Sequence, residues 1–216
     1  PELPIVDSSL EGGFANDVRG QGVSALLVET LATNARSVAA AARTDTGWLP
    51  CTDDTAECVA TVAAVVGSRA YRRPLTAEEE SALVAFLETH RGTEGLVGAS
   101  AMMLEALLQA PQFLYLPEIG AVADDAPPGT VALTGPELAT RLSYFLWNEP
   151  PDATLQAAAE AGELADPGAL EMHARRMLED PRAEATLDRF FGQWLRLDRL
   201  EEADLDRDLY PELNNE

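Results

Sequence analysis

The chain has 216 residues, and its 37 acidic residues against 15 basic ones, all of them Arg, leave a formal net charge of -22. Such a surface repels nucleic acid phosphates and anionic lipid head groups, so the composition argues against both classes of partner. The apolar share of 46% is typical of a soluble globular protein. No apolar stretch approaches the roughly 20 residues that span a bilayer, so we expect no membrane insertion.

The first part of the chain predicts an extended lead-in followed by two helices. Residues 1–23 carry several Gly and no sustained period, and the chain starts in the middle of a loop, as a processed product or an excised piece of something longer would. Ser24 is placed to cap a helix that runs to about Arg43. Asp54-Thr-Ala-Glu57 has the pattern of a capping box for a second helix, which we expect to end near Ala70.

The two cysteines of the chain, Cys51 and Cys58, flank the start of this second helix. Their spacing matches neither the Cys-x-x-Cys redox motif nor the Cys-x-x-Cys-His haem-attachment motif. A short-loop disulfide that clips the loop to the helix is the economical interpretation, and two free thiols are the alternative. A disulfide would indicate an oxidising compartment, namely a periplasm, a cell surface or the extracellular space.

The middle of the chain predicts two more helices and a linker. Thr76-Ala-Glu-Glu79 is a capping box that opens a helix to about His90. After a link punctuated by Gly, a further helix over residues 96–109 is stopped by Pro111, because a proline disfavours helical geometry in the residue before it. Residues 119–132, rich in Pro, Gly and Asp, are expected to form a linker.

The last part of the chain predicts four helices that start at polar caps. The expected spans are Thr134 to Trp147, Asp152 to Glu160, Asp166 to Leu178 and Asp180 to Leu197. With seven or eight helices and no convincing strand pattern, the predicted fold is all-α, an irregular multi-helix bundle. Two lobes are the expected division: residues 1–118 form an N-terminal lobe, and residues 133–216 form a C-terminal lobe that is truncated.

Four segments carry a family resemblance: Arg69–Thr76, Leu107–Glu118, Arg141–Asp152 and Phe191–Leu195. They resemble uncharacterised helical domains of large secreted bacterial proteins, best known from planctomycetes and myxobacteria, some of which also carry cytochrome c domains. The family is named for its unknown function. The resemblance therefore implies an extracytoplasmic address and, as partners, the remaining domains or chains of the same larger protein. Since this chain has no Cys-x-x-Cys-His motif, we expect no cofactor within it, and any haem c would belong to a missing domain or a partner.

An arginine cluster is the first candidate ligand site. Arg69, Arg72 and Arg73 bracket Tyr71 just before Pro74, at a corner between two helices. Guanidinium groups bind carboxylates and other anions in a bidentate manner, so the cluster could clamp an anion. The alternative is structural: these side chains tie the corner to acidic neighbours and to helix-end carbonyls.

Aromatic residues on two helices and the turn after the first of them form a second candidate. Trp147 and Trp194, each with neighbouring Phe or Tyr, could line a sugar-binding groove, or they could fill the core between two packed helices. The turn at Asn148 to Asp152 holds two carboxylates, which can act as acid and base on glycosides only at a suitable separation across a cleft. Asp152 also has a simple role as a helix cap.

The acidic tail contains part of a calcium-loop pattern. Asp204, Asp206 and Asp208 reproduce its first three acidic positions, but Leu209 stands where the loop needs Gly and Asn215 where it needs a bidentate Glu. An EF-hand is therefore disfavoured. A looser calcium site and a solvated run of charge are the two alternatives.

These observations favour a helical scaffold or docking module of a larger secreted multidomain protein. No nucleophile stands beside a base in the sequence, so we assign no catalytic residue, and whether the chain is an enzyme stays open. One alternative is a part in an extracytoplasmic oxidoreductase system with haem on a missing domain or partner. Another is carbohydrate binding or processing.

Overall fold

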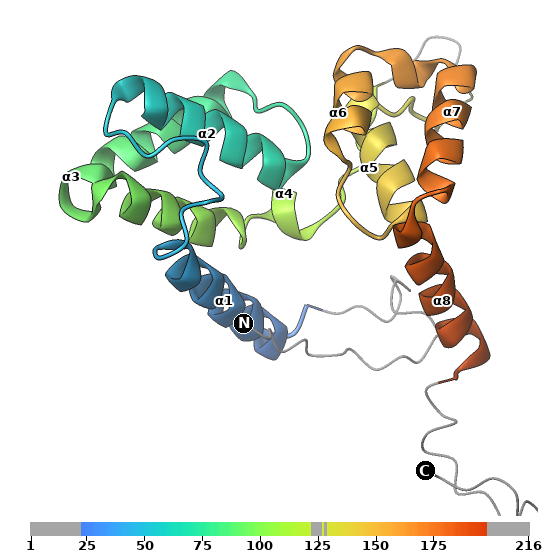
Figure 1. Ribbon diagram of the computed structural model, residues 1–216, viewed down its shortest axis with the longest axis horizontal. Helices are drawn as coiled ribbons and strands as arrows, with labels where there is room; N and C mark the ends of the chain where they lie inside the picture. Colours follow the sequence, from blue (N-terminus) through green and yellow to red (C-terminus); the bar gives the residue numbers. More distant parts are fainter. Residues whose placement is uncertain (1–22, 122–126, 128, 198–216) are drawn as a thin grey trace, which may run out of the picture.

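The computed structural model describes residues 23–121, 127 and 129–197 (Figure 1). This part of the chain forms eight α-helices and one short 3-10 helix, and it contains no β-strand, which confirms the all-α prediction. The elements are α1 (Ala25–Ala42), α2 (Ala56–Tyr71), α3 (Ala77–Leu107), α4 (Pro111–Leu114), α5 (Gly135–Leu146), α6 (Ala153–Glu160), η1 (Glu163–Ala165), α7 (Pro167–Leu178) and α8 (Pro181–Leu195).

The helix starts follow the polar caps. Ser24 caps α1 by accepting a hydrogen bond from the Leu27 N–H, and aspartates cap α6, α7 and α8 in the same way. The cap of α2 was predicted one residue too early. The residue that caps α2 is Thr55, whose hydroxyl accepts a hydrogen bond from the Cys58 N–H at 3.2 Å. Asp54 instead forms an ion pair with Arg91 at 2.9 Å.

The third and fourth predicted helices form one helix in the structure, α3, and the link expected between them is a single non-helical residue. Gly95, with φ 68° and ψ 167°, interrupts the helical geometry of α3 and leaves a kink between its two halves. This combination of angles is open almost only to glycine. After α3, Ala110 is extended as expected, but Pro111 then starts the short helix α4, which the sequence analysis missed. Proline suits the first helical position because its missing N–H would have no partner there.

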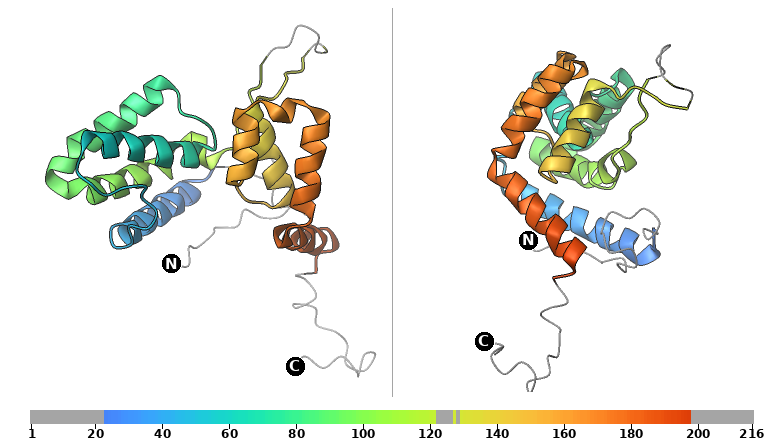
Figure 2. Two further views of the ribbon diagram at one scale, coloured as in Figure 1. Left: turned by 45° about the horizontal axis from the view of Figure 1, so that its top comes forward. Right: turned by 90° about the vertical axis from the view of Figure 1, so that its right-hand side faces the viewer.

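Two separate apolar clusters form the core. The first lies between α2 and α3 and is built from Val59, Val62, Val66, Leu87, Leu96, Met103 and Leu107, with smaller residues around them. The second lies among α5 to α8 and contains Trp147, Leu155, Leu164 and Met177, and the rest of its buried members are Ala. Figure 1 and the left view of Figure 2 show the corresponding helical groups, α1–α4 and α5–α8, as two bodies. Lobe boundaries at residues 118 and 133 stay a prediction.

A disulfide joins Cys51 to Cys58, which confirms the short-loop interpretation. It fastens the loop after α1 to the first turn of α2. The Trp48 indole N–H donates to the Ala42 carbonyl at 3.1 Å and ties the same loop to the end of α1. In the part of the chain that the structure describes, no helix has the length and apolar character needed to cross a membrane.

Candidate functional site

The junction between the two helical groups contains two adjoining pockets. Both are lined by Arg72, Arg73, Pro74 and Pro136. The smaller pocket, of about 210 Å³, lies between the end of α2 and the helices α5 and α6. The larger one, of about 780 Å³, extends along the chain segment from α4 to α5, and we call it the junction groove. Of the predicted ligand residues, the arginine cluster alone lies here.

Arg72 fastens the end of α2 to helix α4 inside the first helical group, at the edge of the junction. It is only 6% exposed, and it adopts the left-handed conformation, with φ 57°, at the end of α2. Its guanidinium donates to the carbonyls of Gln112 at 2.8 Å, Phe113 at 3.1 Å and Tyr115 at 2.7 Å, and also to that of Ala70 at 3.3 Å. These four acceptors occupy the fork that would otherwise bind an anion, so the geometry favours the structural interpretation for Arg72.

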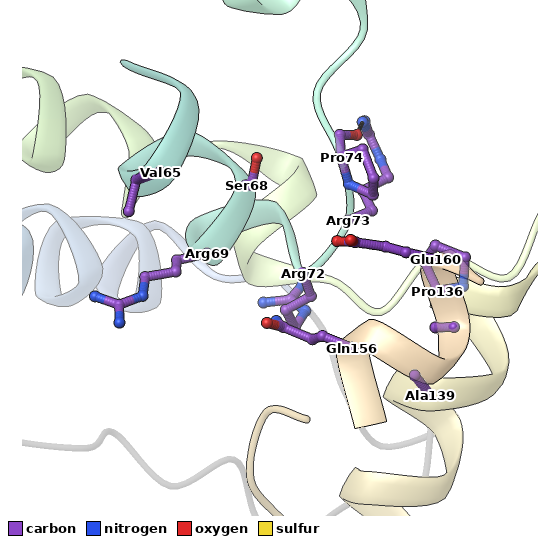
Figure 3. Close-up of a pocket in the computed structure, with 11 residues that line it drawn as sticks. Val65, Ser68, Arg69, Arg72, Arg73, Pro74, Pro136, Ala139, Gln156 and Glu160 are labelled. Atoms are coloured by element: carbon purple, nitrogen blue, oxygen red, sulfur yellow. Dashed lines mark hydrogen bonds between the residues drawn. The ribbon is translucent and has the colours of Figure 1, made fainter. Parts of the chain in front are cut away.

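Arg73 is committed to a neighbouring carboxylate. It forms a bidentate pair with Glu79, at 2.8 and 2.7 Å, and Glu79 also accepts the Thr76 N–H at 2.9 Å. The hydrogen bonds from Arg73 are the main reason that the pKa of Glu79 lies below its usual value. Arg69, in contrast, is exposed and has no partner among the described residues. Figure 3 shows its guanidinium turned away from Gln156 and Glu160, which extend from α6 toward the end of α2.

Glu137 is a central residue of the junction that sequence reasoning assigned only to a helix cap. One carboxylate oxygen accepts the N–H groups of Ile119 at 2.7 Å and Gly120 at 2.9 Å, and the other accepts the N–H and the hydroxyl of Thr134 at 2.7 and 2.8 Å. Burial raises the pKa of Glu137, but these hydrogen bonds outweigh it and the net pKa is lowered. The capping-box pattern was visible in the sequence, but the contact with residues 119 and 120 had no local signal.

Trp147 belongs to the second apolar cluster, where it is 3% exposed. Its indole N–H donates to the Met177 carbonyl at 2.9 Å, and the Arg182 guanidinium lies 3.5 Å from the ring centroid. Since Arg182 covers the ring, no sugar can stack on that face of Trp147, and the groove hypothesis is wrong for this residue.

The turn that follows Trp147 is also structural. Asp152 caps α6 through the Leu155 N–H and forms a bidentate pair with Arg176 at 2.8 and 3.1 Å. Burial raises the pKa of Asp152, but the hydrogen bonds from Arg176 and Leu155 outweigh this effect, and the net pKa is lowered. Asp152 is therefore an ionised ion-pair partner. Asn148 is exposed and left-handed, with φ 54°, and lies on a different groove, between α5 and α8.

The outer face of α8 carries five large apolar side chains, which we call the α8 stripe. Leu187, Phe190, Phe191, Trp194 and Leu195 are each between 43% and 59% exposed, and Ala183 is the one buried residue of the helix. The core-packing alternative is therefore wrong for Trp194 and its two Phe neighbours. Their rings instead contact one another at the surface, with centroids 5.4 to 6.0 Å apart.

A groove of about 690 Å³ continues the α8 stripe onto α5. Phe145, which is 76% exposed, lines it together with Leu187 and Phe190. In Figure 1, α8 extends away from α5–α7. The stripe and this groove together form one apolar surface on the second helical group.

The predicted calcium ligands Asp204, Asp206 and Asp208 lie outside the described residues. Within the described ranges, no three His, Cys, Asp or Glu side chains are grouped so that they could hold a metal ion.

Two family models match the chain. Residues 58–118 match PSD5, described as a protein of unknown function (DUF1595), and residues 133–216 match PSD4, described as a protein of unknown function (DUF1592). Two segments of the chain are thus similar to domains of unknown function. This agrees with the resemblance to uncharacterised domains. Neither a curated protein nor a solved structure matches the chain.

The matched segments divide the candidate sites between them. Arg72 and Arg73 come from the PSD5 segment, while Pro136 and Glu137 come from the PSD4 segment, so the junction groove is built by both. The α8 stripe lies wholly in the PSD4 segment.

Proposed function

We propose that this chain is a helical docking module of a larger extracytoplasmic protein and that the α8 stripe, with the groove beside it, is its docking surface. The observation that carries the proposal is the exposure of Leu187, Phe190, Phe191, Trp194 and Leu195 on one helix. Exposed apolar patches on soluble proteins are small unless they serve an interaction.

The chemistry of the stripe suits a protein partner. Aromatic side chains supply most of the anchors at protein interfaces, because each buries a large area while fixing few torsions. The net charge of -22 prevents non-specific association, so the apolar stripe can remain exposed until its partner binds. The partners are other domains or chains of the same larger protein, and the resemblance to proteins of which some carry cytochrome c domains makes such a domain one candidate.

The disulfide supports the extracytoplasmic location. Cys51, in the loop before α2, is bonded to Cys58 in the first turn of that helix, and such bonds form and persist mainly in oxidising compartments. The arrangement of helices around two small cores, with the apolar stripe left outside, supports a scaffold role.

Site-specific photo-crosslinking in the producing cells tests the proposal. A benzophenone amino acid at position 194 should crosslink to another segment of the larger protein or to an associated chain. The matched control places it at Ala185, which is exposed on the same helix. Ala185 lies nine residues away from Trp194, and at 3.6 residues per turn this is the opposite side of α8.

A second arm uses the double substitution Phe190→Ser and Trp194→Ser, which should abolish the crosslink from a probe at Leu187 while the helical circular dichroism stays unchanged. Equal crosslinking from positions 194 and 185 would contradict the proposal. Crosslinks formed only between copies of this chain would also contradict the proposal, because they would show that the α8 stripe is the interface of a homodimer.

A further inference from the structure

The junction groove has the size and lining of a ligand site, and it is separate from the docking surface on α8. Its volume of about 780 Å³ falls within the range of about 300–1,000 Å³ that small-molecule sites occupy. Four of its lining residues are prolines: Pro74, Pro111, Pro117 and Pro136. Proline rings are rigid, so this wall is largely formed before a ligand arrives.

The charged groups that line the groove are already satisfied. Arg72 donates to four backbone carbonyls, Arg73 is paired with Glu79, and both oxygens of Glu137 accept two hydrogen bonds each. An anionic or cationic ligand would have to break these contacts to gain a partner, at a cost that exceeds that of a neutral hydrogen bond.

The groups that remain free in the groove are neutral. The side chains of Tyr71, Gln112, Tyr115 and Thr140 line it, and none of them makes a hydrogen bond to any residue that the structure describes. They offer three hydroxyls and one amide, which can each donate and accept. Tyr115 is 56% exposed, so its ring also offers a flat apolar face.

The smaller pocket of Figure 3 extends the groove past Arg72 and Arg73, and the Arg69 guanidinium that also lines it, unpaired among the described residues, is turned away from Gln156 and Glu160. Gln156 adds a second amide, and Glu160 adds a carboxylate that accepts from hydroxyls and repels anions. The chain's net charge of -22 adds to this repulsion of polyanions.

From this arrangement we infer that the junction groove binds a neutral, hydroxyl-rich ligand, namely a segment of uncharged polysaccharide. Tyr115 stacks on the apolar face of a sugar ring, while Tyr71, Gln112 and Thr140 exchange hydrogen bonds with its hydroxyls. The site lies between the PSD5 and PSD4 segments, so ligand binding also joins the two helical groups.

A proline-rich peptide is the competing occupant. Domains that recognise such peptides present grooves lined by several aromatic residues, between which the peptide docks. Here the prolines belong to the groove itself, and one exposed ring, that of Tyr115, accompanies several free polar groups. The balance of groups therefore favours the sugar.

Isothermal titration calorimetry on the chain tests the inference with cellohexaose, xylohexaose and mannohexaose as neutral probes. Hexagalacturonate is the anionic comparison, and decaproline is the peptide comparison. At least one neutral hexasaccharide should bind, and Tyr115→Ala should weaken its association about tenfold through the lost stacking. Thr140→Val, which removes a hydroxyl at nearly constant shape, should weaken it about two- to tenfold.

The control is Met172→Ala, which removes a 57% exposed apolar side chain on α7, outside both the junction groove and the proposed docking surface, and it should leave the affinity unchanged. Circular dichroism and the melting temperature establish that each variant is folded. The inference is overturned if no neutral probe binds, if hexagalacturonate or decaproline binds in a Tyr115-dependent manner, or if Tyr115→Ala and Thr140→Val both leave sugar binding intact.

Discussion

The two helical groups reach stability in different ways. The first, α1–α4, buries Val, Leu and Met side chains between α2 and α3, and a disulfide closes its edge. The second, α5–α8, has a smaller core of four Ala, two Leu and one Met around one large ring, that of Trp147. Its own large aromatic residues on α8 lie at the surface.

Charged groups compensate for the small core of the second group. Arg182 stacks on Trp147 and pairs with Asp180 at 2.8 Å, and Arg176 approaches the same ring while pairing with Asp152. The core of the second group is completed by Leu155, Leu164 and Met177 without the aromatic residues of α8, which lie at the surface. The second group therefore combines a smaller core with an exposed apolar helix, as its proposed docking role requires.

The strongest test of this difference is Trp147→Ala. Replacing a buried indole by Ala typically lowers the free energy of unfolding by about 3–5 kcal/mol. Here it also removes the hydrogen bond to the Met177 carbonyl and the ring on which Arg182 stacks. We expect peptides from α5–α7 to lose hydrogen-exchange protection while peptides from α2 and α3 keep theirs. Mass-spectrometric hydrogen exchange measures both at once.

Trp194→Ala is the control for that experiment. It removes an indole that is 59% exposed, so protection in both groups should change little. If Trp147→Ala lowered protection equally in α2 and α5, the two groups would unfold as one unit, and the comparison would fail.

The disulfide should matter to the first group alone. Replacing Cys51 and Cys58 by Ser releases a loop that spans seven positions, and chain entropy predicts a loss of about 2–3 kcal/mol. Peptides from the start of α2 should exchange faster, and those from α5–α7 should not. A melting curve with and without reductant provides the independent measurement, and no change in either would show that the loop is held by Trp48 instead.

A smaller effect is expected at the kink of α3. Gly95→Ala places a side chain on a backbone conformation, φ 68° and ψ 167°, that is nearly restricted to glycine, at a cost of about 1–3 kcal/mol. Gly92→Ala, three residues earlier in regular helix with open space around it, should stabilise by about 0.5–1 kcal/mol. Urea unfolding of the two variants compares them, and equal shifts would contradict the assigned kink.

Local signals predicted most of the fold. Caps such as Ser24 and Asp152 act within three residues, so their hydroxyls and carboxylates mark helix starts directly in the sequence. The break at Gly95 was visible as a Gly-rich link for the same reason. Helix α4 was missed because a four-residue helix has too few positions to show a period.

The candidate sites depended on contacts that no local pattern encodes. Arg72 meets carbonyls 40 to 43 positions away, so its structural role appeared only in three dimensions. Trp147 and Trp194 both stand on apolar faces, but one is covered by Arg182 and the other is exposed. Amphipathic spacing predicts that a face will be buried, and it does not identify whether this chain or a partner buries it.

Acid should weaken the second group through Asp180, which gives the smallest of these effects. The hydrogen bonds from the Arg182 side chain, and then from its backbone N–H, lower the pKa of Asp180 from 3.8 to about 2. Because the folded pKa is the lower one, the stabilising contribution is complete above about pH 4 and is lost as the pH falls toward 2. Protection of α7 and α8 should therefore decline over that window. Asp180→Asn keeps a side-chain oxygen for the cap but cannot ionise, so the decline should become shallower; an unchanged pH profile would mean that Asp152 and its partner Arg176 dominate the acid response.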